Sequence, residues 1–199
     1  MRRYNLFVLL AALILPVSAA YAVPMTFVGT LSGANEIPPT ASSGTGFASV
    51  VLDPTVETIQ INVTYSGLTT PTTAAHIHCC EPSPMFPMNQ GVATTVPAFP
   101  GFVTGMTFGD YHSAVLSLLD AGTYNPAFVA MFPGGIPQAA AALISGIENE
   151  ETYLNIHTTM FPGGEIRSFL VPAPEPTSLV LFGSALLGFG LIWHRKLRS

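Results

Sequence analysis

Apolar and polar residues alternate through the middle of the chain, and this alternation predicts β-strands. In the run 57–67, Ile59, Ile61, Val63 and Tyr65 are separated by polar residues. A period of two indicates a strand with one buried face. Further β-rich runs, bounded by residues that favour turns, cover 25–31, 47–53, 73–79, 152–158 and 165–171. The short turn at 54–56 predicts a hairpin.

Other segments lack this alternation. Residues 32–46 form a turn-rich loop, and 81–110, rich in Pro, Gly and Phe, predicts a long ordered loop with at most one short strand. The alanine-rich segment 137–150 predicts one helix, while 113–119 is ambiguous. The pattern favours a mainly β fold, an antiparallel β-sandwich with Greek-key-like connections and one short helix, flanked by two hydrophobic terminal helices.

The N-terminal 22 residues have the pattern of a signal peptide. Arg2 and Arg3 precede an apolar run at 6–17, and Ala20 and Ala22 occupy the small positions that a signal peptidase accepts. Cleavage after Ala22 is therefore expected. The alternative, a retained anchor, is disfavoured because a membrane span needs about 20 apolar residues.

The C-terminal segment 174–199 combines three features. Pro174-Glu175-Pro176 stands before an uncharged apolar run at 179–193, and Arg195, Lys196 and Arg198 follow. The basic end predicts a transmembrane helix with its C-terminus in the cytoplasm. The arrangement resembles the PEP-CTERM sorting signal of exopolysaccharide-producing Gram-negative bacteria. The resemblance implies an inner-membrane anchor that an exosortase-type enzyme processes, with release to the cell surface or extracellular matrix. The alternative is a permanent single-span anchor.

The charge of the intervening domain, residues 23–173, is strongly acidic. Ten acidic residues face a single basic residue, Arg167. Nucleic-acid binding needs clustered Lys and Arg, so this class of partner is excluded. Such a surface also repels anionic polymers, although contacts with polysaccharide through bridging cations stay open.

Three histidines are candidate metal ligands. His76 and His78 lie two residues apart, so on a strand they project from the same face. His157 lies in the predicted strand 152–158, and three imidazoles converge if the two strands are neighbours. Three His with one open position suit zinc or copper. The alternative is a set of structural histidines bonded to loop backbone.

Cys79 and Cys80 are the only cysteines. After export they meet an oxidising compartment, but adjacent residues of a strand face opposite ways, so bridging them requires an unusual turn. A vicinal disulfide, two free thiols and a soft metal site with His78 are all open.

Glu165 and Arg167 share a strand face in the same way. They predict a structural ion pair, with ligand binding or acid–base work as the alternative. No nucleophile elbow, phosphate loop or nucleotide fingerprint is present.

Four segments together resemble the successive motifs of the CHRD domain, first described in chordin. They are "LSGANEIPP", "YSGLT", "AAHIH" and "YLNIHTTMFPGGEIRSFL", within residues 25–171. The resemblance implies an antiparallel β-sandwich but no defined biochemical role. Two departures are Cys79-Cys80, where Gly usually follows His-x-His, and Ser168, where Gly is common. The His-x-His strand also resembles copper-zinc superoxide dismutase locally, without a full ligand set.

Three functions follow from these observations. The first hypothesis is an exported, surface- or matrix-associated binding or structural module without catalysis or a required cofactor, whose partners are extracellular polysaccharide or matrix proteins. The second is an extracytoplasmic copper or zinc protein that uses His76, His78 and His157, with redox activity as a further option. An enzyme comes third, because spacing alone assembles no acid–base pair.

Overall fold

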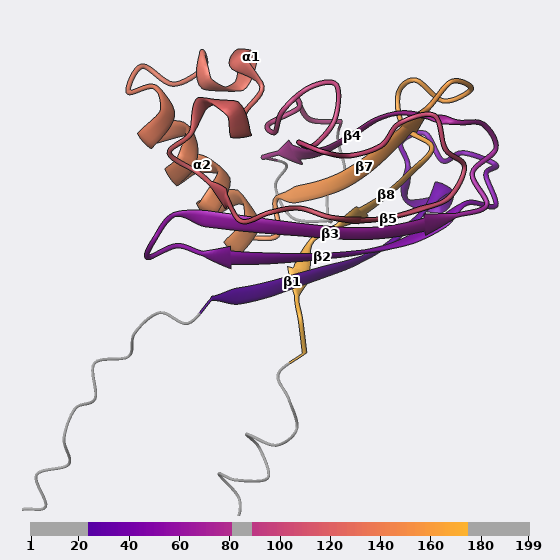
Figure 1. Ribbon diagram of the computed structural model, residues 1–199, viewed down its shortest axis with the longest axis horizontal. Coiled ribbons are helices and arrows are strands. Elements are labelled where there is room, and N and C mark those ends of the chain that lie inside the picture. The colour runs from indigo at the N-terminus through magenta and orange to yellow at the C-terminus, as the bar shows by residue number, and fades with distance from the viewer. Residues whose placement is uncertain (1–23, 81–88, 175–199) are drawn as a thin grey trace, which may run out of the picture.

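The computed structural model describes residues 24–80 and 89–174 (Figure 1). Its strands form a nine-stranded antiparallel sheet. They are β1 (Met25–Ser32), β2 (Thr45–Asp53), β3 (Thr58–Ser66), β4 (Thr72–Cys79), β5 (Gly109–His112), β6 (Leu116–Ser117), β7 (Thr152–Thr158), β8 (Ile166–Phe169) and β9 (Val171–Pro172). The helices are α1 (Pro126–Val129) and α2 (Ile136–Glu148), with 3-10 turns η1 (Gly33–Asn35) and η2 (Ala121–Thr123).

The sheet curls so that its two ends lie over each other. The strand order is β4-β7-β8-β1-β2-β3-β5, with β6 beside β3 and β9 beside β1. In Figure 1, β1, β2, β3 and β5 form one layer and β4, β7 and β8 the other. A single residue pair, Ser32 with Arg167, joins β1 to β8 at the corner. The predicted mainly β, antiparallel, sandwich-like fold is therefore confirmed, as one curled sheet.

Most predicted elements are present. The hairpin around residues 54–56 pairs β2 and β3 along their whole length, and the predicted helix is α2. The ambiguous segment 113–119 contains β6, because Leu116 pairs with Ile59 of β3. The predicted strand 165–171 is divided into β8 and β9, and Leu170 between them donates its backbone N–H to Thr152 O.

The hydrophobic core fills the space between the layers and extends under α2. Ile59, Ile61 and Val63, the alternating residues of β3, are buried as their period predicts. Helix α2 adds Leu143 and Ile147, both fully buried. Burial of each such side chain stabilises the fold by about 1.5–3 kcal/mol, so the core holds the two layers in a fixed relation.

The outer edge of β4 is covered by the segment 91–99. Ala93 N and Thr94 N both donate to Ile77 O, and Phe99 N donates to Ala75 O. This segment follows β4 closely and brings backbone carbonyl groups to the histidine-bearing face of that strand.

The two export signals lie outside the described residues, apart from Pro174. This holds for Ala20 and Ala22, for Glu175 and Pro176, and for both predicted hydrophobic helices. Within 24–80 and 89–174, no helix has the length and apolar character needed to cross a membrane.

Candidate metal centre

Strands β4 and β7 bring the three histidines together. Their register sets His76 opposite Asn155, His78 opposite Tyr153 and Ala74 opposite His157, so all three imidazoles leave the same face of the sheet. One nitrogen from each ring lies within 4.8 Å of the others. His76 Nδ1 and His157 Nε2 are 3.2 Å apart. The convergence predicted from strand alternation is present.

Backbone carbonyl groups fix the orientation of each ring. His78 Nδ1 donates to Gln90 O at 2.8 Å, and His157 Nδ1 donates to Pro162 O at 3.0 Å. His76 hydrogen-bonds to the backbone of Pro97. The acceptors of His78 and His157 assign the N–H of these two rings to Nδ1 and leave their Nε2 atoms without a proton. The structural interpretation is thus correct for one side of the His78 and His157 rings, and one nitrogen of every ring lies within the cluster.

The histidines are neutral at physiological pH. Burial, together with the neighbouring His157 and His78, lowers the pKa of His76 to about 3. Burial is also the main cause that lowers the pKa of His78 to about 4, against the opposing hydrogen bond to Gln90. Burial lowers the pKa of His157 in the same direction. Neutral imidazole is the form that binds metal.

An aromatic and cationic stack supports His78 from behind. The Tyr153 ring lies parallel to the His78 ring with centroids 4.7 Å apart, and Arg167 Cζ lies 4.6 Å from the Tyr153 centroid. Gln90 N donates to Tyr153 Oη at 3.0 Å, so one loop residue binds both rings. The stack holds His78 in one orientation.

Arg167 is fully buried beside this stack. Its Nε donates to Asn35 O at 2.5 Å, and its Nη1 donates to Asn89 Oδ1 at 2.9 Å. The carboxylate partner is Glu36, with 3.8 Å between Arg167 Nε and Glu36 Oε2. Burial raises the pKa of Glu36 to about 7, although Arg167 and a hydrogen bond from Asn155 oppose this shift.

The predicted ion pair between Glu165 and Arg167 does not form. Glu165 instead accepts hydrogen bonds from Ser42 Oγ at 2.5 Å, Thr69 N at 2.6 Å and Thr158 Oγ1 at 2.6 Å. Burial would raise the pKa of Glu165, but these donors outweigh it and lower the pKa. Glu165 precedes β8, whose first residue is Ile166, so strand alternation does not govern its side chain.

Cys79 and Cys80 form a vicinal disulfide. Of the alternatives left open by the sequence, neither free thiols nor a cysteine ligand beside His78 is adopted in the described structure. Both sulfur atoms face α2, where Cys80 Sγ lies 3.5 Å from Ala142 O. The disulfide therefore packs under the helix, away from the histidine cluster.

Gly146 of α2 makes this packing possible. A Cβ atom at this position would lie 2.7 Å from Cys80 Sγ and 2.8 Å from Cys79 Sγ. We expect Gly146→Ala to lower the free energy of unfolding by about 1–3 kcal/mol, because overpacking outweighs the better helix propensity of alanine. Urea unfolding with the disulfide intact measures the change. The exposed neighbour Ser145→Ala is the control, and equal stability of the two variants would contradict the packing argument.

Family comparisons place this site in a known domain. The family model for the CHRD domain matches residues 27–170. The chain belongs to the CHRD domain family. A second match, for the PEP-CTERM protein-sorting motif, covers residues 172–196 directly after the CHRD domain. No curated protein and no solved structure gives a significant match.

The two matches establish an exported CHRD protein that carries a sorting signal for an exosortase-type processing enzyme. Its three clustered histidines, Glu36 and Arg167 all fall within the CHRD match. Glu36 is the site residue that sequence reasoning missed. It stands in the "NEIPP" loop, distant in sequence from Arg167, and no periodic pattern links the two.

Proposed function

We propose that this CHRD protein is an extracytoplasmic metal-binding protein whose centre consists of His76, His78 and His157. One observation carries the proposal. His78 and His157 each donate Nδ1–H to a backbone carbonyl group, and one nitrogen of every ring lies within 4.8 Å of the other two. In metal centres, hydrogen bonds from the outer nitrogen of a histidine fix the tautomer and aim the other nitrogen at the metal.

A metal cation would give the unpaired nitrogen of the cluster a partner. His76 Nδ1 and His157 Nε2 lie 3.2 Å apart, and His78 Nε2 is buried without a hydrogen-bond partner. Unpaired buried acceptors cost free energy. Nitrogens that bind one tetrahedral metal at about 2.0 Å are about 3.3 Å apart, close to the spacing of this pair.

The ligand set selects the class of metal. The cluster contains three imidazoles and no carboxylate. Calcium and magnesium prefer oxygen ligands, whereas neutral imidazole suits zinc and copper. Three protein ligands also leave one coordination position for water or a small ligand, as in catalytic zinc sites. We therefore expect copper or zinc, with an accessible fourth position.

Metal analysis of the full chain tests this proposal. After loading with copper or zinc and dialysis, we expect about one equivalent of metal in the wild type and loss of it in His78→Ala. The control is His112→Ala, which removes an exposed histidine outside the cluster. Bound metal should also raise the free energy of unfolding, by about 4 kcal/mol at a thousandfold excess over Kd. Wild type without stoichiometric metal, or equal metal in the two variants, would show that the cluster is structural only.

A binding role at the cell surface is a second candidate function. The observation that favours it is Phe47, a large aromatic side chain that is 48% exposed between its register partners Thr30 and Thr64. Export by way of a sorting signal would bring such a face to the extracellular matrix. The binding role and the metal centre use different surfaces, so they are compatible.

A further inference from the structure

The solvent-facing side of β2 carries an aromatic residue whose register partners bear hydroxyl groups. Phe47 pairs in register with Thr30 of β1 and with Thr64 of β3. The next outward row contains Ser49, Asn62 and His112. We call this surface, with the groove beside it, the Phe47 face.

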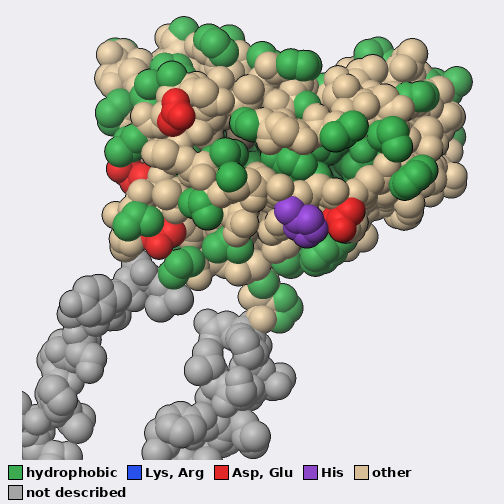
Figure 2. Space-filling view, viewed as in Figure 1, with side chains coloured by type: hydrophobic (Ala, Val, Ile, Leu, Met, Phe, Trp, Pro, Cys, Tyr) green, Lys and Arg blue, Asp and Glu red, His purple; other side chains and the backbone are tan. Residues whose placement is uncertain are grey.

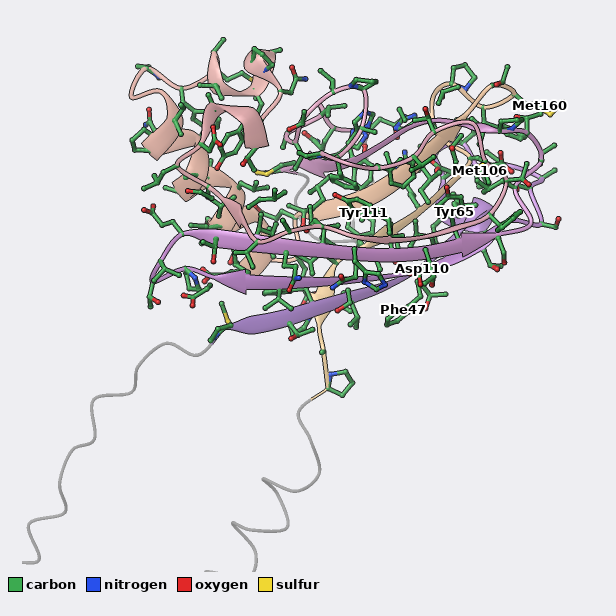
Figure 3. The ribbon with its side chains drawn as sticks, viewed as in Figure 1. Phe47, Tyr65, Met106, Asp110, Tyr111 and Met160 are labelled. Carbon is green, nitrogen blue, oxygen red and sulfur yellow. A yellow bond between two sulfur atoms is a disulfide. The ribbon has the colours of Figure 1, made fainter. Side chains whose placement is uncertain are left out.

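The groove lies between the segment 101–108 and strands β3 and β5. It has a volume of about 420 Å³, and its walls include Tyr65, Phe102, Phe108, Asp110 and His112. The side chain of Phe108 is 62% exposed. Tyr65 points into the core, whereas Asp110 is exposed on the outer side of the sheet, as Phe47 is (Figure 3). Aromatic rings and polar groups therefore line the same groove.

Two smaller hollows continue the groove around Phe47. One is lined by Phe47, Asn62 and His112, and the other by Phe47, Thr64 and Tyr65. Each shares a residue with the groove, His112 in the first case and Tyr65 in the second. The three depressions are thus neighbours, an arrangement that suits an extended chain with repeating units.

The polar groups of the face are held in place before any ligand binds. His112 Nε2 lies 3.0 Å from Asp110 Oδ1, and His112 Nδ1 lies 2.8 Å from Asn62 Oδ1. Carboxylate, imidazole, amide and hydroxyl groups offer both donors and acceptors at fixed positions. Preorganised polar side chains of this kind reduce the entropic cost of binding.

The charge of the described surface limits the classes of ligand that the Phe47 face can bind. Arg167 is the only Lys or Arg among the described residues, and it is fully buried. The visible face in Figure 2 accordingly has red and purple side chains but no blue ones. Nucleic acids and anionic polymers find no cation here. A stable protein interface would need about 800 Å² per partner with an apolar centre, whereas the register partners of Phe47 are the hydroxyl-bearing Thr30 and Thr64.

We propose that the Phe47 face binds an uncharged polysaccharide chain. Sugar rings present an apolar C–H face that stacks on an aromatic ring, and a rim of hydroxyls that pair with Asp110, Asn62 and His112. This inference specifies the ligand of the second candidate function and is independent of the metal centre.

Affinity electrophoresis of the full chain tests the inference. The gels contain cellulose ether, xylan, mannan, galactan or dextran, with alginate as the anionic comparison. We expect retardation by at least one neutral polymer and none by alginate. Phe47→Thr should weaken this binding by about tenfold, and Phe108→Ala in the same direction. The variants should fold normally, because both residues are exposed and threonine favours strands.

Val56→Thr is the matched control. It replaces an apolar residue, 64% exposed, in the β2–β3 turn away from the face, and should bind as the wild type does. The proposal is overturned if no neutral polymer retards the protein, or if retardation is equal in Phe47→Thr and Val56→Thr. Light scattering and pull-down of extracted matrix proteins distinguish failure of the polysaccharide proposal from failure of the binding role itself. Self-association or protein capture that depends on Phe47 would preserve a binding role with a different partner. If neither is observed, the binding role is contradicted as well.

Discussion

Arg167→Met will lower the free energy of unfolding by about 3–5 kcal/mol, the range for removing one partner of a buried ion pair. The side chain is fully buried and donates to Asn35 O and Asn89 Oδ1. Its loss removes these hydrogen bonds, leaves the buried Glu36 without its cation and removes the cation from the Tyr153 ring. Urea-induced unfolding of the metal-free protein measures the change.

Two further variants separate charge from shape. Arg167→Lys keeps the charge but cannot reproduce the planar set of donors, so its stability should fall between those of wild type and Arg167→Met. Glu36→Gln combined with Arg167→Met should cost less than the sum of the two single changes, because the pair is coupled. A loss below about 1 kcal/mol in Arg167→Met would show that the buried guanidinium is dispensable.

The stability difference between Glu36→Gln and wild type will change with pH. The folded protein raises the pKa of Glu36 to about 7, so it holds this proton more tightly than the unfolded chain does. The stability contributed by Glu36 is therefore complete below pH 4.5 and lost as pH rises through 7. Glutamine stays neutral throughout. We expect the variant to gain about 2–3 kcal/mol relative to wild type between pH 4.5 and 8.

The histidine cluster changes stability with pH in the opposite direction to Glu36. The effect of Glu36 therefore has to be measured as the difference between Glu36→Gln and wild type. The pKa values of His76 and His78 are lowered to about 3 and about 4. Their stabilising contribution is present above about pH 6.5, the unfolded pKa, and is lost as pH falls toward the folded values. Subtracting the wild-type curve from that of Glu36→Gln, both in a chelator, cancels this contribution. A difference that stays constant with pH would mean that Glu36 is not perturbed by burial.

Local patterns were sufficient to predict the strands and the histidine cluster. The alternation in β3 identified its buried face, and His-x-His in β4 required only that β7 be its neighbour. Neighbouring strands with a known parity fix which side chains meet, because the period of two leaves one face for each residue. The position of the helix followed from a similarly local pattern.

The contacts of the charged residues could not be predicted in this way. Glu36 reaches Arg167 from a loop, and Glu165 turns toward Ser42 and Thr69 because it lies outside β8. Loop conformations depend on the tertiary fold that they cover, and no period in the sequence describes them. The disulfide shows a related limit. Its sulfurs are accommodated by Gly146, a helical residue whose role becomes visible only when α2 is placed over β4.

The segment 91–99 has a further effect through its pairing with β4. An end strand of a sheet exposes a row of backbone donors and acceptors that can recruit a strand from another molecule. Here Ala75 and Ile77 already use their carbonyl groups to accept from Phe99, Ala93 and Thr94. At the other end of the strand order, β5 is only four residues long. Among the described residues, neither end of the sheet offers a long open edge, so the fold resists edge-to-edge polymerisation when many copies are crowded together.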